Sequence, residues 1–197
     1  MLKPISANHP LILASSSKYR AELLARLRIP FVGIAPEIDE APQQSEAAEA
    51  LSRRLARAKA KVLSRKHPDR WVLGSDQAAS CDGQILGKPG SHARAVEQLQ
   101  LASGRTMDFH TSVTLMQGSF CETLTDLTCV KFRTLETAEI ERYLAQEPAY
   151  DCAGSFKCEG LGITLFDSIE SRDPTALIGL PLIAVRRLLA SAELMLP

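Results

Sequence analysis

The sequence predicts an α/β protein, because short apolar segments alternate with segments that have the composition of helices. Apolar runs at 11–14, 31–35 and 71–74 have the length of buried strands. Segments 18–27 and 46–66 lie between these runs and are typical of helices. The longer of the two contains neither Gly nor Pro and is rich in Ala, Leu, Arg and Lys, which are favourable helix residues.

The second half of the chain predicts hairpins and further helices. Asp82-Gly83 lies between two short stretches of strand-like sequence and is a strong signal for a two-residue hairpin turn. Residues 107–116 and 121–132 are typical of an antiparallel pair joined around Gly118. The remaining expected elements are helices near 91–102 and 136–146, a glycine-rich loop around 154–162, and a terminal helix from Pro181 to about Ala190.

Composition and charge narrow the class of protein. The chain has 197 residues, of which 45% are hydrophobic, enough for a buried core in one domain or one two-lobed domain. Its formal net charge of +0 gives no argument for a nucleic acid polymer or an acidic membrane surface as a partner. No apolar run approaches the length of a membrane span. Residues 1–10 lack the apolar core of a signal peptide and are expected to form a short polar leader.

The cysteine pattern predicts a reducing compartment and therefore a cytoplasmic protein. Five cysteines occur, at positions 81, 121, 129, 152 and 158. The count is odd and no Cys-x-x-Cys pair is present, which is typical of reduced thiols rather than of a disulfide framework. The four histidines are scattered and make no zinc-binding pattern.

The first candidate site follows the strand at 11–14, where the motif Ser15-x-Ser17-x-x-Arg20 leads into a helix. Such a turn offers backbone N–H groups, the positive end of a helix dipole, hydroxyl donors and a fork-shaped cation, a combination that suits a phosphate group. Ser is also the commonest helix cap and needs no ligand in that role. Both interpretations stay open from the motif alone.

Asp76 lies just beyond the apolar segment 71–74, from which only Ser75 separates it. Open α/β sheets place their chemistry just beyond the carboxyl ends of buried strands. If this strand runs parallel to the one at 11–14, Asp76 shares a sheet edge with the Ser15–Arg20 turn. The alternative is that Asp76 is an ordinary turn or cap residue.

Lys59 differs from the other basic residues of the helix at 46–66. Most of those have basic neighbours one turn away, whereas the residues three and four positions from Lys59 are Leu55, Ala56, Val62 and Leu63. An ammonium group in such an apolar surrounding has two explanations. Either the stem of the side chain snorkels at the edge of the apolar stripe, or the ammonium is directed at a buried anion.

Two further segments add carboxylates and a cation. Glu37-Ile38-Asp39-Glu40 places three carboxylates in four residues, and Lys88 lies in the constrained turn Gly87–Gly90. Each feature alone is typical of a solvated surface. Together with the hydroxyls and cations described above, they predict a site for a metal-bound polyphosphate.

Eight short segments resemble, in order along nearly the whole chain, the successive blocks of the Maf family of nucleoside triphosphate pyrophosphatases. They are Leu13–Arg20, Glu37–Glu40, Ala58–Lys61, Gly74–Gln77, Gly87–Pro89, Ser103–Gly104, Ala153–Gly160 and Gly179–Leu182. Gly74-Ser-Asp-Gln77 and Ser155-Phe-Lys-Cys-Glu159 look most like the 7-methyl-GTP pyrophosphatase branch. The resemblance implies a single Maf-like domain over 1–197, of the inosine triphosphate pyrophosphatase type. Its central mixed sheet is flanked by helices, with an active-site cleft between two lobes.

The resemblance also implies roles for individual residues. Asp76 matches the family's catalytic carboxylate, described as the proton acceptor. The residues that match the phosphate site are Ser15, Arg20, Lys59 and Lys88, to which the serine motif adds Ser17. The residues that match the specificity positions are Tyr19, Gln77 and Glu159. Asp39 and Glu40 match an acidic pair that, with Asp76, is expected to ligate Mg²⁺ or Mn²⁺, unless the pair only shapes the entrance.

Two positions depart from the family's pattern. Lys18 stands where the family usually has Pro, and Tyr19 stands where this branch usually has Trp. Tyr19 keeps an aromatic face for the delocalised positive charge of 7-methylguanine, an attraction of roughly 0.5–2 kcal/mol. Glu159 can accept hydrogen bonds from guanine N1–H and the 2-amino group. The departures bear on selectivity for methylguanine more than on the reaction itself.

The expected reaction is hydrolysis of the α–β phosphoanhydride, which makes the protein a hydrolase acting on acid anhydrides. Asp76 would take the proton from the attacking water, and Arg20, Lys59 and Lys88 would hold the phosphates. A nearby lysine is expected to lower the pKa of Asp76, so the choice between general base and metal ligand stays open.

The expected substrate is 7-methyl-GTP, converted to 7-methyl-GMP and pyrophosphate, with the clearing of modified nucleotides as the biological role. One alternative is a nucleotide-binding regulator of cell division and septum formation, because some relatives are described as inhibitors of septum formation. Another is a pyrophosphatase for other non-standard nucleotides. A homodimer is implied by the resemblance alone.

Overall fold

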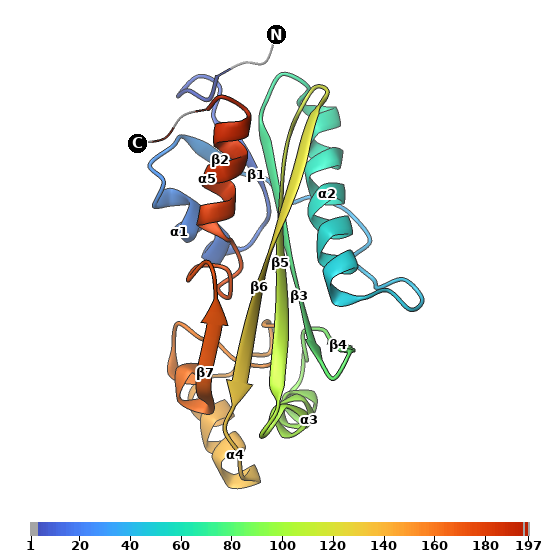
Figure 1. The fold of residues 1–197 in the computed structure, drawn as a ribbon, viewed down its shortest axis with the longest axis vertical. Helices are drawn as coiled ribbons and strands as arrows, with labels where there is room; N and C mark the ends of the chain where they lie inside the picture. The colour runs from blue at the N-terminus through green and yellow to red at the C-terminus, as the bar shows by residue number, and fades with distance from the viewer. Residues whose placement is uncertain (1–3, 195, 197) are drawn as a thin grey trace. The chain divides into compact units, whose positions relative to one another are not determined.

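A seven-stranded mixed sheet organises the chain in the computed structural model, which describes residues 4–194 and 196 (Figure 1). The strand order is β2-β1-β3-β5-β6-β7, and β4 pairs with β3. The strands are β1 (Leu11–Ala14), β2 (Phe31–Gly33), β3 (Val72–Cys81), β4 (Gln84–Leu86), β5 (Thr106–Gln117), β6 (Phe120–Phe132) and β7 (Phe166–Ser171). The helices are α1 (Lys18–Ala25), α2 (Ala48–Lys66), α3 (His92–Ala102), α4 (Thr137–Gln146) and α5 (Leu182–Ser191), with a short 3₁₀ helix η1 at Leu161–Leu165. The predicted α/β class with a central mixed sheet is confirmed.

The chain divides into two compact units. The first comprises Met1–Gln77, Thr111–Asp126 and Asp173–Pro197, and the second comprises Ala78–His110 and Leu127–Arg172. β3, β5 and β6 contribute residues to both units. Neither unit is therefore a single stretch of sequence.

The first unit contains three parallel strands with helices on both faces. β1 pairs in parallel with β2 and with β3, so that Ala14 lies beside Gly74. Alternation along β1 directs Leu11 and Leu13 into a core shared with α1 and α5, and Ile12 with Ala14 into a second core against α2. Figure 1 shows α5 and α2 on opposite sides of these strands. Each fully buried Leu or Ile contributes about 1.5–3 kcal/mol to this packing.

A cluster of four phenylalanines lies in the core of the second unit. Edge-to-face contacts link Phe109, Phe132, Phe156 and Phe166, with ring centroids 4.8 to 5.5 Å apart. Pairs of this kind add about 0.5–1.5 kcal/mol beyond the area that they bury. Gly154 lies against the cluster with a φ of +79°, and a Cβ there would be 2.8 Å from the sulfur of Met107. Glycine at this position therefore permits a close approach of the backbone to the cluster.

The expected helices are all present, with small shifts at their ends, and the Asp82-Gly83 hairpin is confirmed by the pairing of Cys81 with Gln84. Two strands differ from expectation. β3 continues through Ser75–Gln77 instead of ending before them, because these polar side chains find partners within the fold. β7 was not expected, because most of its side chains are exposed and carry no apolar alternation. None of the helices in the described part of the chain combines the length and hydropathy of a membrane span.

Candidate active site

A buried ion pair between Lys59 and Asp76 forms the centre of the candidate site. The Nζ of Lys59 donates a hydrogen bond to Oδ1 of Asp76 at 2.6 Å. The two residues are only 5% and 6% exposed. Of the two explanations that the helix pattern left open for Lys59, the structure supports the buried anion.

The close packing of α2 on β3 brings these two side chains together. Gly74 and Asp76 are two residues apart on β3 and therefore share one face of the sheet. A Cβ on Gly74 would lie 2.2 Å from the carbonyl oxygen of Ala56 and 2.7 Å from the backbone nitrogen of Ala60. Only glycine permits this approach, which places Lys59, between these two alanines on α2, against Asp76.

A second carboxylate reaches the same ammonium group. Oε1 of Glu40 lies 2.9 Å from Nζ of Lys59, and the Glu40 side chain is 54% exposed. Asp39 instead uses Oδ1 to accept a hydrogen bond from the backbone N–H of Ala41 at 2.9 Å, which stabilises the local turn. The structure thus divides the expected acidic pair, and Glu40 is the member that contacts Lys59.

Two carboxylates, those of Asp76 and Glu40, are available near the centre of the site as ligands for a divalent cation. Among the described residues, no group of three or more His, Cys, Asp and Glu side chains is arranged to hold a metal ion. Asp76 and Glu40 nevertheless converge on one position, the ammonium of Lys59. Mg²⁺ is commonly bound by one or two carboxylates together with water and substrate phosphates, so two carboxylates are sufficient in number for such an ion.

Burial raises the pKa of Asp76 above its ordinary value, and the charge of Glu40 raises it further. Lys59 and Arg20 act in the opposite direction, as expected for nearby cations, but the burial outweighs them. A carboxylate with a raised pKa is a stronger base when ionised. The environment therefore favours proton abstraction by Asp76.

Arg20 is held by the segment that precedes α5. Its Nε donates to the carbonyl oxygen of Gly179 at 2.9 Å, and the hydroxyl of Ser75 donates to the same oxygen at 3.1 Å. Gly179 has a φ of +123°, which excludes residues other than glycine without strain. Burial lowers the pKa of Arg20 while Asp76 and Glu40 raise it, and the guanidinium stays protonated because an arginine pKa starts far above neutral.

The two motif serines stabilise the turn that leads into α1. Ser17 is the N-cap residue, and its Oγ accepts a hydrogen bond from the backbone N–H of Arg20 at 3.4 Å. The Oγ of Ser15 accepts from the N–H of Ser17 at 3.1 Å. The capping interpretation thus holds for Ser17, whereas Ser15 stabilises the turn before the helix, and the contact of either hydroxyl with a phosphate stays a proposal.

Gln77 is tied to the same segment as Arg20. Its Nε2 lies within hydrogen-bond distance of the carbonyl oxygens of Ala176 at 3.0 Å and Leu177 at 3.1 Å. The same nitrogen lies 2.9 Å from the hydroxyl oxygen of Thr111, which itself donates to Ala176. These contacts make Gln77 a support for the backbone that leads to Gly179.

Tyr19 is half-buried on the first turn of α1. The Nζ of Lys18 lies 5.0 Å from the centroid of its ring. The two residues that depart from the family's pattern therefore contact each other.

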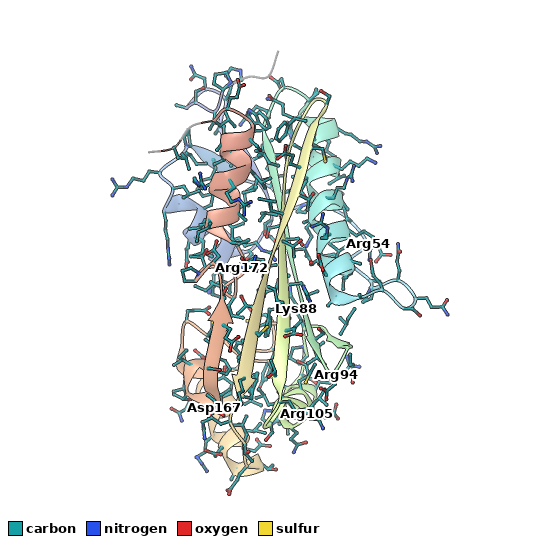
Figure 2. The ribbon with its side chains drawn as sticks, in the orientation of Figure 1. Arg54, Lys88, Arg94, Arg105, Asp167 and Arg172 are labelled. Atoms are coloured by element: carbon teal, nitrogen blue, oxygen red, sulfur yellow. The ribbon has the colours of Figure 1, made fainter. Side chains whose placement is uncertain are left out.

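Lys88 and Glu159 belong to the second unit, and both are exposed (Figure 2 labels Lys88). Gln98 on α3 connects the chain segments that carry them. Its Nε2 donates to the carbonyl oxygen of Gly87 at 2.9 Å, and its Oε1 accepts from the hydroxyl of Ser155 at 2.6 Å. Ser155 is fully buried and has a φ of +65°, an uncommon value for a residue other than glycine.

The loop at 154–162, which carries Glu159, is held at its C-terminal end by Glu147, the residue that follows α4. Glu147 accepts hydrogen bonds from the N–H of Gly162 at 3.1 Å and from the hydroxyl of Tyr143 at 3.2 Å. A Cβ on Gly160 would lie 2.1 Å from an oxygen of the same carboxylate. The glycines of this loop therefore allow the backbone to close around Glu147.

The family of the chain follows from comparison with known sequences. The family model for Maf-like proteins matches residues 10–192. The chain belongs to the Maf family. It is 58% identical over 187 residues to the 7-methyl-GTP pyrophosphatase of Xanthomonas oryzae pv. oryzae, covering 95% of this chain and 98% of that one. It is 54% identical over 179 residues to the 7-methyl-GTP pyrophosphatase of Bordetella pertussis, covering 91% and 90% of the two chains.

Solved structures give more distant similarities to this Maf chain. The Ham1 protein of Staphylococcus aureus has a TM-score of 0.49 and 12% identity, covering 63% of this chain and 72% of that one. A HAM1 protein from Coxiella burnetii has a TM-score of 0.44 and 17% identity, covering 62% and 72%.

Some residues of this Maf site were missed by sequence reasoning. Asp173, only 2% exposed, accepts hydrogen bonds from the backbone N–H groups of Ile183 at 2.6 Å and Thr175 at 2.9 Å. The Oγ1 of Thr175 accepts from the N–H of Leu182 at 2.9 Å. These bonds fix the start of α5 and with it the Gly179 segment. The available signal was an Asp-x-Thr sequence shortly before a predicted helix start, which is typical of capping.

Proposed function

We propose that this Maf chain is a nucleoside triphosphate pyrophosphatase that hydrolyses the α–β phosphoanhydride. The observation that carries the proposal is the buried Lys59–Asp76 pair, with Glu40 on the same ammonium and Arg20 close enough to influence the pKa of Asp76. A basic carboxylate beside two fixed cations suits the attack of water on a phosphate ester or anhydride. The enzymes named 7-methyl-GTP pyrophosphatase, at 54–58% identity, support 7-methyl-GTP as the substrate.

In this mechanism, Asp76 accepts a proton from the water that attacks the α-phosphorus. The new P–O bond forms as the bond from the α-phosphorus to the bridging oxygen breaks, and that oxygen leaves as part of pyrophosphate. Arg20 and Lys59 would stabilise the charge on the phosphate oxygens, and Lys88 would add a third cation. Ser15 and Ser17 would orient the phosphates at the start of α1.

Glu40 would hold a divalent cation, Mg²⁺ or Mn²⁺, and Asp76 would be its second ligand in the alternative in which Asp76 is not the base. When bound, such an ion neutralises charge on the polyphosphate and on the departing pyrophosphate. Asp39 precedes Glu40 in the sequence and would help to position Glu40 through the turn that it stabilises. We expect chelation to remove activity without unfolding the protein, since Lys59 already pairs with both carboxylates.

For the base, we propose that Tyr19 stacks on the purine and that Glu159 accepts hydrogen bonds from its N1–H and 2-amino groups. Gln77 would act on specificity indirectly, through the 176–179 segment that it supports.

The same proposal covers the setting of the enzyme. All five cysteines are free, which supports a reducing compartment, and we place the protein in the cytoplasm, where it would clear modified nucleotides. Its partner would be the free nucleotide, and neither a nucleic acid polymer nor a membrane is part of the proposal. The homodimer stays an expectation that rests on the family resemblance.

Product analysis tests the proposal. The chain is incubated with 7-methyl-GTP, GTP, dTTP, UTP and ITP, in the presence of Mg²⁺ or Mn²⁺, and the products are separated by ion-exchange chromatography. Pyrophosphate with 7-methyl-GMP, formed fastest from 7-methyl-GTP, is the expected result. A faster reaction with another nucleotide would contradict 7-methyl-GTP as the preferred substrate but would still support the pyrophosphatase reaction. Tight nucleotide binding with no product would overturn the reaction and favour the regulator of cell division.

Asp76→Asn provides the matched test of the catalytic residue. We expect turnover to fall by at least about 10²-fold, because general base catalysis typically contributes that much. Asp82→Asn is the control, since it makes the same chemical change in an exposed hairpin turn that accepts Asn as readily as Asp. Activity of Asp76→Asn above one tenth of the wild-type value would contradict the assigned role.

A further inference from the structure

Lys18 places its ammonium group over the ring of its neighbour Tyr19. The distance from Nζ to the ring centroid is 5.0 Å, within the range of a cation–π contact. Lys18 is the first residue of α1 and is exposed, whereas Tyr19 is half-buried. The half-buried ring has a limited accessible surface, and part of it lies under a positive charge supplied by the chain itself.

The ring belongs to the same turn as the candidate phosphate ligands. Ser17 caps α1 immediately before Lys18, and Arg20 follows Tyr19 directly. Arg20 in turn is bound to Gly179 and influences the pKa of Asp76. A nucleotide whose phosphates bind at this turn therefore has its base within reach of Tyr19, an inference that rests on the proposed function.

We propose that Lys18 sets the selectivity of this site between cationic and neutral purine rings. The ammonium occupies an aromatic surface that a 7-methylguanine ring, which is itself a cation, would use. A methylated ring that stacks there is repelled by the like charge of Lys18, whereas neutral guanine meets no such repulsion. The chain consequently accepts neutral purine triphosphates such as GTP more readily than the same site without Lys18.

The test compares kcat/KM for 7-methyl-GTP and for GTP in the wild type and in Lys18→Gln. Glutamine removes the charge and keeps a polar side chain of similar reach. We expect the ratio of kcat/KM for 7-methyl-GTP to kcat/KM for GTP to rise about two- to five-fold in Lys18→Gln. This fold-change corresponds to the free energy of an exposed cation–π contact. Arg26→Gln is the control, because it removes one exposed positive charge from the other end of the same helix and should leave the ratio unchanged.

Repeating the Lys18→Gln comparison in the Tyr19→Leu variant distinguishes an effect through the Tyr19 ring from a general effect of charge on the kcat/KM ratio. In Tyr19→Leu the aromatic surface is absent, so adding Lys18→Gln should no longer change the ratio. An equal change in both backgrounds, or no change in the wild-type background, would overturn the proposal. Calorimetric binding of 7-methyl-GMP and GMP gives the same ratio without turnover. The absence of hydrolysis would then contradict the proposed function alone, while an unchanged binding ratio would contradict the role of Lys18.

Discussion

Replacing Lys59 by methionine tests whether the buried ion pair organises the site. Methionine keeps most of the length of the side chain and removes the ammonium, so Asp76 loses a hydrogen bond of 2.6 Å. Lys59 and Asp76 are 5% and 6% exposed, so water cannot readily replace the lost partner. Removing one member of such a pair costs about 3–5 kcal/mol of the free energy of unfolding. We expect about 3 kcal/mol at pH 8, the lower end of that range, because Asp76 can relieve its burial by taking up a proton.

The loss should depend on pH through the same carboxyl group. Lys59 lowers the pKa of Asp76, which burial already raises, so this pKa rises further in Lys59→Met. A carboxyl group whose pKa is higher in the folded than in the unfolded chain gives the folded state the greater share of protons. Stability then falls as the pH rises from the unfolded value, about 3.9, through the folded pKa. The difference from wild type should accordingly be smaller at pH 5 than at pH 8.

Urea denaturation at both pH values measures this effect. Asp76→Asn and the double variant complete a cycle, and the double variant should recover much of the stability lost in Lys59→Met, because no buried carboxylate is left unpaired. Lys61→Met, on the same helix but exposed, is the control and should stay within about 0.5 kcal/mol of wild type. A loss below about 1 kcal/mol at pH 8, or one that does not shrink at pH 5, would refute the reasoning.

Two further variants test how the elements around the site are held. Gly74→Ala places a Cβ against the backbone of α2 and should lower the free energy of unfolding by about 1–3 kcal/mol. Urea denaturation should show this loss beside Gly87→Ala, whose Cβ meets nothing within 4 Å, and equal stability of the two variants would contradict the close packing. Gln98→Leu removes the hydrogen-bond partner of the buried Ser155 hydroxyl and should cost about 1–3 kcal/mol by the same measurement. Gln100→Leu, exposed on the same helix, is its control, and an identical urea midpoint would count against the role of Gln98.

Local patterns were sufficient to predict most of the elements and part of the site. The apolar runs and their spacing predicted β1 and α2. The apolar neighbours of Lys59 on its helix indicated a buried anion as one of two explanations, and the structure shows that anion as Asp76. Short-range signals such as Asp82-Gly83 carry their own geometry, because the turn requires those residue types whatever surrounds it.

Other features depend on contacts that no local pattern contains. The raised pKa of Asp76 follows from its burial under α2, which requires the packing against Gly74 to be known. The Nε2 of Gln77 is engaged by carbonyl groups about a hundred positions further along the chain. β7 has mostly exposed side chains and is defined by its antiparallel pairing with β6, so its sequence carries little strand signal.

The core of the first unit joins segments that are far apart in the sequence, since Leu11 and Leu13 of β1 pack with Val185 and Leu188 of α5. A ribosome makes β1 well before α5, with the whole second unit in between. The carbonyl group of Gly179 that holds Arg20 is likewise made only after the second unit. A nascent or prematurely terminated chain would therefore carry the Ser15–Arg20 turn without its support. In the cell, the assembly of this site would wait until the Gly179 segment has been synthesised.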